Sequence, residues 1–284
     1  MSKLDEFASI FRSADKAQYT HAGVEVRRVA LFTDVAAEPS RRFCADVKGL
    51  LTSLSTDIEW VVVDGDQYRL IDELLGHVER IKPDLICAYR NLHGRARRFA
   101  FSLGGHVDVL TQATTTPVLL LPDPDEEHRL PASCKNTDRV MVLTDHLTGS
   151  DRIVSYGVRF TEDAGHLVLA HLENDQVFDR YLAVISKIPT IDTDEARLRI
   201  REQLLKEPKE YIRSCQDELA RHGVPLAVHE EVTMGHHVAE CRRLIDKHEI
   251  DLVVMNTKDE DQLAMHGLAY PLAVELRDIP LLLL

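Results

Sequence analysis

The residues with the clearest chemical potential lie between Arg90 and Leu110, in the stretch RNLHGRARRFAFSLGGHVDVL. Four arginines occur within nine residues, and glycines follow at positions 94, 104 and 105. Glycine lets backbone N–H groups approach an anion, and the start of a helix offers unpaired N–H donors with partial positive charge. Two interpretations are open: a loop that cradles a phosphate, or a solvated loop followed by an ordinary helix.

The rest of the chain is acidic, which makes a basic stretch informative. The 284 residues include 34 Lys+Arg and 47 Asp+Glu, a net charge of -13. Such a surface repels nucleic acids and anionic membranes, so we expect neither as a partner. Any anionic ligand must find a local basic pocket. The length predicts two domains.

The cysteines and apolar runs indicate the compartment. The five cysteines show no CxxC spacing and are odd in number, which favours a reducing environment over a disulfide framework. The first 18 residues are charged throughout and lack an apolar signal core, and no apolar run reaches the ~18 residues of a membrane span. We therefore expect a cytoplasmic protein. We also expect buried, unreactive thiols at Cys44, Cys87 and Cys241.

Two halves of the chain repeat the same pattern. RRVALFTD, residues 27–34, matches DRVMVLTD, residues 138–145. KPDLICAYRNLHG starts at Lys82, and EIDLVVMNTKDED starts at Glu249. Gly104 and Gly267 each lie 13 residues before the proline of a final apolar run, TPVLLLP or IPLLLL. These matches predict an internal duplication.

The repeat predicts an α/β protein made of two tandem, doubly wound domains with parallel sheets. The predicted domains cover residues 1–124 and 138–284, with a proline-rich linker at 125–137. The second copy is longer, with an extra strand near 165–173 and a charged helical stretch near 194–222, in which Pro208 should start or kink a helix turn. The first copy lacks one strand–helix unit.

This constellation resembles the universal stress protein family in its tandem two-domain form. Members open with a strand ending in Asp and carry G-x-x-G, nine residues, G-[S/T], a helix, and a strand led by Pro-Val. The first copy reads NLHG, RARRFAFSL, GG and TPVLLL. The resemblance covers the chain from about residue 27. It implies a Rossmann-like fold of the adenine nucleotide alpha hydrolase type. The family contains both adenine-nucleotide binders and non-binders.

The resemblance implies a site for ATP or AMP in the first domain. Asp34 would lie near the adenine or ribose, and the loop glycines would bring backbone N–H groups to the phosphates. Two residues depart from the pattern: Asn91 replaces a glycine, and Gly105 replaces the hydroxyl residue. Asn tolerates positive φ, so we expect the turn to persist. The predicted binding residues are Asp34, Asn91, His93, Gly94, Arg95, Gly104 and Gly105.

The basic side chains of this loop leave alternatives open. We expect most of the arginines to be solvated, with Arg95 the one that faces the phosphates. Arg90 follows the strand directly and could also point at the pocket. His93 could touch a phosphate, or it could be a loop histidine bonded to backbone.

The second copy should hold no phosphate site. It has no loop glycine before Gly267, and Leu268 takes the place of the hydroxyl residue. Asp259, Glu260 and Asp261 would repel a triphosphate. The chain would then pair one binding domain with one structural or regulatory domain.

Neither a metal site nor a catalytic centre is predicted. His229, Glu231, His236 and His237 lack an i, i+4 histidine pair or a cysteine pair to support zinc. No G-x-S-x-G elbow occurs, so at most slow ATP hydrolysis is expected. A weaker alternative is an enzyme with a histidine-lined pocket in the second copy.

Two functions remain open. One is a nucleotide-binding stress-response regulator. The other is a nucleotide-free interaction scaffold, in which the last strands, PVLLL and PLLLL, pair within one chain or in a homodimer.

Overall fold

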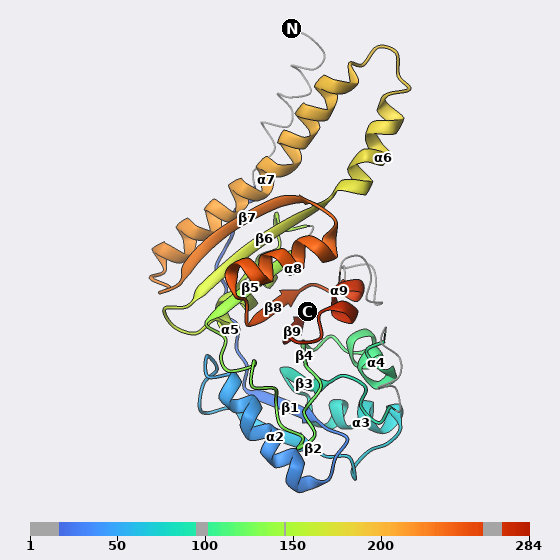
Figure 1. Cartoon of the computed structure of the whole chain (residues 1–284). Coiled ribbons are helices and arrows are strands. Elements are labelled where there is room, and N and C mark those ends of the chain that lie inside the picture. The colour runs from blue at the N-terminus through green and yellow to red at the C-terminus, as the bar shows by residue number, and fades with distance from the viewer. Residues whose placement is uncertain (1–16, 95–101, 145, 258–268) are drawn as a thin grey trace.

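The computed structural model describes residues 17–94, 102–144, 146–257 and 269–284 (Figure 1). The first half of the chain contains β1 (Arg28–Phe32), α2 (Ala37–Leu50), β2 (Glu59–Val63), α3 (Ile71–Ile81), β3 (Leu85–Tyr89), α4 (Gly105–Ala113) and β4 (Val118–Leu121). The second half contains β5 (Arg139–Thr144), α5 (Asp151–Phe160), β6 (His166–Asn174), α6 (Asp175–Ile185), α7 (Thr193–Arg221), β7 (Ala227–Gly235), α8 (His237–His248), β8 (Leu252–Met255), α9 (Ala269–Glu275) and β9 (Leu281–Leu283).

The described strands form one sheet in the order β2-β1-β3-β4-β9-β8-β5-β6-β7. Every neighbouring pair is parallel except β4 and β9, which run antiparallel with Leu119 opposite Leu282. The predicted α/β fold with parallel, doubly wound strands is confirmed. The structure adds that the two last strands pair within one chain and join both sets into a single sheet. The domain boundary at 125–137 stays a prediction.

Helices on both faces explain the strand sequences. In the first half, α2 covers one face of the sheet, and α3 and α4 cover the other (Figure 1). Strands buried on both sides need continuous apolar runs, and β3 (LICAY) and β4 (VLLL) are buried at every position. The thiols of Cys44, Cys87 and Cys241 are buried in this core, as predicted. Within the described residues, no helix is long and apolar enough to cross a membrane.

The halves differ at their outer edges. In the first half β2 pairs directly with β1 and ends the sheet. In the second half β6 takes the equivalent place beside β5, and β7 follows as an additional strand. The strand–helix unit that the first copy lacks is therefore the outermost one. The predicted charged helix is α7, and it continues through Pro208 instead of starting anew there.

Two carboxylates lie together at the amino ends of β5 and β8. Asp251 precedes β8, and its neighbours are Asp138 and the backbone N–H of Arg139, which donates to Asp251 Oδ2 at 3.2 Å. Burial, together with a hydrogen bond and charge repulsion from Asp138, raises the pKa of Asp251 to about 7. The folded chain therefore holds a proton here that an unfolded aspartate releases near pH 4.

This pair predicts a pH dependence of stability. Between about pH 4 and pH 7, the folded state binds more protons at Asp251 than the unfolded state, so the free energy of unfolding falls as pH rises. Asp251→Asn should flatten this part of the profile and be more stable than wild type above pH 7. Denaturant titrations across this pH window would show it. A profile with an unchanged slope would contradict the assignment, and Asp138→Asn should act in the same direction.

Candidate functional site

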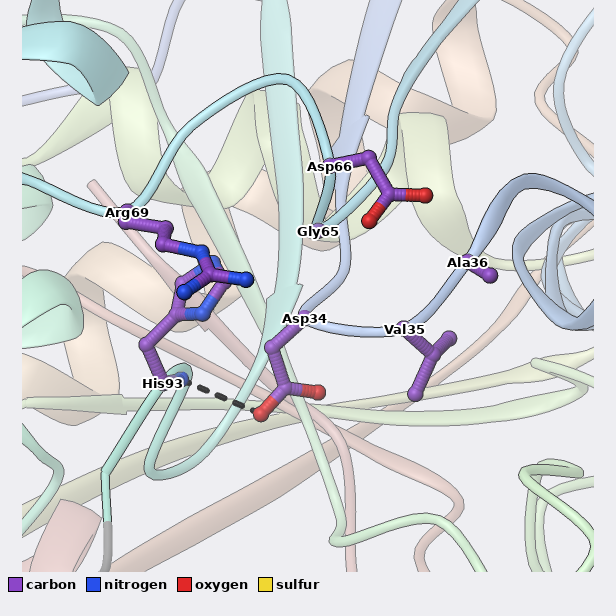
Figure 2. A pocket seen from close by; sticks show the side chains of 7 residues that line it. All are labelled: Asp34, Val35, Ala36, Gly65, Asp66, Arg69 and His93. Carbon is purple, nitrogen blue, oxygen red and sulfur yellow. Dashed lines mark hydrogen bonds between the residues drawn. The ribbon is translucent and has the colours of Figure 1, made fainter.

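A pocket lies at the carboxyl ends of β1, β2 and β3 (Figure 2). Its volume is about 320 Å³, near the lower end of the ~300–1,000 Å³ typical for small-molecule sites. Ligands of open α/β sheets bind at this edge, beside the strand where the order reverses, here β1. The lining residues are Asp34, Val35, Ala36, Gly65, Asp66, Arg69 and His93.

Asp34 is held in place from two sides. Its Oδ1 accepts a hydrogen bond from the Tyr89 hydroxyl at the end of β3, and its backbone N–H donates back to that hydroxyl at 2.9 Å. Its Oδ2 accepts from the backbone N–H of His93 at 3.1 Å. A carboxylate has about four acceptor sites, so capacity for a ligand hydroxyl or amine remains. The carboxylate is thus positioned before any ligand arrives.

Gly65 brings the loop after β2 against the loop after β1. Its backbone N–H donates to Val35 O at 2.7 Å. A Cβ at this position would lie 2.4 Å from the Asp34 carbonyl carbon and 2.9 Å from Val35 N. Only glycine allows this approach, so Gly65 shapes the pocket wall next to Asp34.

The predicted phosphate loop begins with a tight turn. Asn91 has φ 56, so it takes the positive-φ conformation expected where a family glycine is replaced. Gly94 N–H donates to Asn91 O at 2.8 Å, and Asn91 N–H donates to Leu103 O at 2.8 Å. The second bond brings the end of the loop back to its start, beside the beginning of α4.

Gly104 and Gly105 differ in how much room each leaves for a side chain. Gly104 is the residue before α4 and has φ 93, and a Cβ there would lie 2.7 Å from the Asn91 Cα. At Gly105 the nearest atom to an added Cβ is Ile71 Cδ1, at 3.9 Å. Gly104 is therefore required by the loop's own packing, whereas Gly105 has room for the serine or threonine of the family pattern.

These two glycines give a matched prediction. Gly105→Ser should fold with wild-type stability, to within about 0.5 kcal/mol for an exposed site. Gly104→Ala should cost about 2 kcal/mol or more, because positive φ and a backbone clash coincide there. Melting temperatures of the two variants would test this. Equal stability of both would refute the packing role of Gly104.

Aromatic and imidazole rings pack together beside the loop. His93 lies edge-on to Tyr68, with ring centroids 4.7 Å apart, and 5.4 Å from the ring of His106. Burial lowers the pKa of His93, which keeps the ring neutral near pH 7. Its buried Nε2 and the buried hydroxyl of Tyr68 have no hydrogen-bond partner among the described residues. Such orphaned polar atoms are costly and mark places where water or a ligand completes the network.

Arg69 supplies the positive charge at the pocket. Its side chain is exposed, and in the described part of the chain its guanidinium has neither an ion pair nor a hydrogen bond. Its backbone is fixed instead: the N–H donates to Glu73 Oε2 at 2.7 Å, and the carbonyl oxygen lies 3.0 Å from His106 Nε2. A free cation on a fixed backbone is suited to an anionic group.

Arg90 differs from both sequence-based interpretations. It is neither on the surface nor directed at the pocket: only 3% of it is exposed, and its guanidinium donates to the carbonyl oxygens of Ala273 and Leu276. Those carbonyls lie in α9 and directly after it, so Arg90 connects the two halves. A strand-end arginine looks the same in sequence whether it faces solvent or a second domain.

The seven predicted site residues thus separate into groups. Asp34 and His93 line the pocket, Asn91 and Gly94 form the turn, and Gly104 and Gly105 start α4. Arg95 lies outside the described residues, as do the second-copy residues Asp259, Glu260, Asp261, Gly267 and Leu268. Gly65, Asp66 and Arg69 were not predicted from the sequence. The one signal for them is position, because the DGDQYR segment follows β2, whose carboxyl end meets the same sheet edge.

The histidines of the second half do not gather around one point. His229 Nε2 lies 3.0 Å from His166 Nδ1 at the start of β6, and Glu231 pairs with Lys247 and His248 at 2.5 and 2.7 Å. His171 lies five residues further along β6, about 16 Å away along the strand. Among the described residues, no three His, Cys, Asp or Glu side chains could hold a metal ion together.

Solved structures with the same arrangement decide the fold. A Pseudomonas aeruginosa UCBPP-PA14 protein assigned to the universal stress proteins aligns with a TM-score of 0.51, covering 91% of this chain and 93% of its own, at 11% identity. The chain has the fold of a universal stress protein. A functionally unknown protein from P. aeruginosa PAO1 shares this fold, with a TM-score of 0.50, 13% identity and coverage of 91% and 92%.

A third solved structure is less similar. A universal stress protein from Archaeoglobus fulgidus DSM 4304 aligns at a TM-score of 0.46, with 12% identity and coverage of 91% and 85%. No family model matches the sequence, and no curated protein matches it. At these identities, the universal stress protein fold is what the comparisons establish.

Proposed function

We propose that this chain is a universal stress protein-like regulator that binds an adenine nucleotide in its first half. The observation that carries the proposal is the pocket that joins Asp34 to Arg69 at the carboxyl ends of β1, β2 and β3. The resemblance of NLHG and GG to the family's phosphate loop supports the same place.

The pocket holds charges of both signs. Arg69 lies beside the neutral ring of His93, Asp66 lies across the pocket from them, and the Asp34 carboxylate lies next to the His93 backbone (Figure 2). A phosphate would bind Arg69, because carboxylates repel it. Asp34 and Asp66 would accept from ribose hydroxyls or an adenine amine. Arg69 is the only cation lining the pocket in the described chain, so AMP matches the available charge better than ATP.

Arg69→Met tests the phosphate contact. A charge-assisted hydrogen bond contributes about 1.5–3 kcal/mol, so its loss should weaken AMP binding roughly 10- to 100-fold while adenosine binding stays near wild type. The measurement is isothermal titration calorimetry with AMP, ATP and adenosine. Arg80→Met is the matched control, since Arg80 is an exposed arginine on α3 away from the pocket.

The wild type must bind first for this comparison to have meaning. AMP at about 100 times its Kd should stabilise the fold by ~2.7 kcal/mol, which a thermal melt detects. No shift with any adenine nucleotide would sink the proposal. Equal loss of AMP and adenosine affinity in Arg69→Met would place the phosphate elsewhere.

A second function has support of its own. The chain can act as an interaction scaffold without a nucleotide, because a long helical arm in the second half exposes apolar side chains. This function does not compete with nucleotide binding, since the two surfaces lie on different halves.

A further inference from the structure

A helical arm extends from the second half of the sheet. It is formed by residues 175–210, which comprise α6 and the first part of α7, and it projects beyond the outer ends of β6 and β7 (Figure 1). The helix α7 has 29 residues and is about 43 Å long, longer than the sheet it covers requires. The C-terminal part of α7 packs on the sheet through buried Tyr211, Ile212 and Cys215. The N-terminal part of α7 belongs to the arm.

The helix α6 is apolar on two faces. Phe178 and Leu182 are buried on the inner face. The outer face carries Val177, Tyr181 and Val184, which are 41%, 66% and 59% exposed. Hydrogen bonds from Lys187 N–H to Val184 O and from Ile188 N–H to Ile185 O continue the helix by a turn, which adds Ile188 at 43% exposure. The outer residues Val177, Tyr181, Val184 and Ile188 are called the α6 stripe below.

Exposed hydrophobic side chains of the described residues are concentrated on and near the α6 stripe. Of the seven large hydrophobic side chains exposed in the described residues, six lie between Val177 and Leu198. Scattered exposed hydrophobics are ordinary, but a set with spacings of four, three and four residues forms one helical seam. Helices with such a seam pack against another helix. A stripe of this kind therefore indicates an interface.

Charge selects the partner. The whole chain has a net charge of -13, so two copies repel each other over most of their surfaces. The arm differs, because its eight acidic and seven basic residues nearly cancel. Both signs are mixed along it: Arg180 follows Asp179 on α6, and Arg197 and Arg199 follow Asp194 and Glu195 on α7. A basic partner would prefer the acidic remainder of the chain, and an anionic membrane would be repelled by it.

The stripe is also complementary to itself. When two copies of α6 run antiparallel about a twofold axis between Tyr181 and Val184, Val177 faces Ile188 of the other copy and Tyr181 faces Val184. Closed dimers use such isologous contacts, in which one patch binds its own copy. Strand pairing is a less open route to a dimer. β4 and β9 already pair within the chain, and the edge strands carry charged side chains that disfavour strand addition, Glu59 on β2 and Glu230 and Glu231 on β7.

We propose that the α6 stripe is the interface of a homodimer, in which two arms pack antiparallel and hold two universal stress protein folds together. This inference is independent of nucleotide binding, because the arm lies in the other half of the chain.

The test is the oligomeric state of the full chain, measured by sedimentation velocity across the micromolar range. The wild type should be dimeric. Tyr181→Glu places a charge at the centre of the seam and should weaken dimerisation by at least about tenfold. Leu70→Glu is the matched control, because Leu70 is also 66% exposed and lies far from the arm on the first half; it should dimerise like wild type. Circular dichroism confirms that each variant is folded.

Three results would overturn the proposal. The first is a wild-type monomer at every concentration. The second is a Tyr181→Glu dimer as stable as the wild-type dimer. The third comes from a variant that lacks residues 1–16. If this variant forms a dimer that Tyr181→Glu disrupts, whereas the full chain stays monomeric, then the chain's own N-terminal segment is the partner of the stripe.

Discussion

Gly65→Ala should lower the free energy of unfolding by about 3 kcal/mol or more and remove the nucleotide binding proposed for the pocket. The added Cβ would lie 2.4 and 2.5 Å from the carbonyl carbon and oxygen of Asp34 and 2.9 Å from Val35 N. These are backbone atoms, so no side-chain rotation relieves the clash. The loop after β1 must move, and with it the carboxylate that Tyr89 and His93 hold in place.

The control for this substitution is Gly76→Ala. Gly76 lies exposed within α3 and would place its new Cβ in open space. Alanine favours a helix over glycine by about 0.8–1 kcal/mol, so this variant should be slightly more stable than wild type. Denaturant titrations give both free energies. If Gly65→Ala unfolds like Gly76→Ala, the close contact between the two loops is not needed for the fold.

The fold was open to prediction because its signals are local. Continuous apolar runs such as LICAY and VLLL indicate strands buried on both faces, and their repetition indicates two similar halves. The single antiparallel contact between β4 and β9 was not decided by sequence. Both strands are apolar throughout, and such strands carry no mark that distinguishes a partner in the same chain from one in another.

The site was predictable only where the family pattern names a residue. Asp34, Asn91 and Gly104 follow from spacing. Arg69 does not, because nothing in DGDQYR shows that its guanidinium faces a cavity and not bulk solvent. Gly65 is similar: its need for glycine comes from a contact with Asp34, which is 31 residues away in sequence. Contacts between distant segments are formed by the topology, and one sequence does not display them.

Arg90 shows that the sequence can also suggest contacts that the fold does not make. The four clustered arginines predicted contact with a phosphate or exposure to solvent. Arg90 has neither, because its partners are carbonyl groups more than 180 residues away in sequence. Its backbone leads directly into the turn at Asn91. Arg90 is thus the covalent neighbour of the site and the hydrogen-bonding partner of the other half.

Arg90→Met should destabilise the protein by about 3 kcal/mol and weaken the proposed AMP binding at the same time. Two effects oppose each other. Removing a buried charge recovers its desolvation cost, and replacement of buried ions by apolar groups can be neutral or favourable. Against this, the carbonyls of Ala273 and Leu276 lose charge-assisted donors while staying buried, at about 1–3 kcal/mol each.

The second effect should be larger, because methionine cannot pair either carbonyl and the charges of Asp123 and Asp278 would lose a nearby cation. Burial lowers the pKa of Arg90 only to about 10, so the cation is present at pH 7. Arg90→Lys, which keeps the charge but not the fork, should lose less stability. Arg80→Met controls for the removal of an arginine. If Arg90→Met is as stable as wild type but loses AMP binding, Arg90 positions the loop without joining the halves. If neither the stability nor the AMP affinity changes, the contact with α9 has no energetic role.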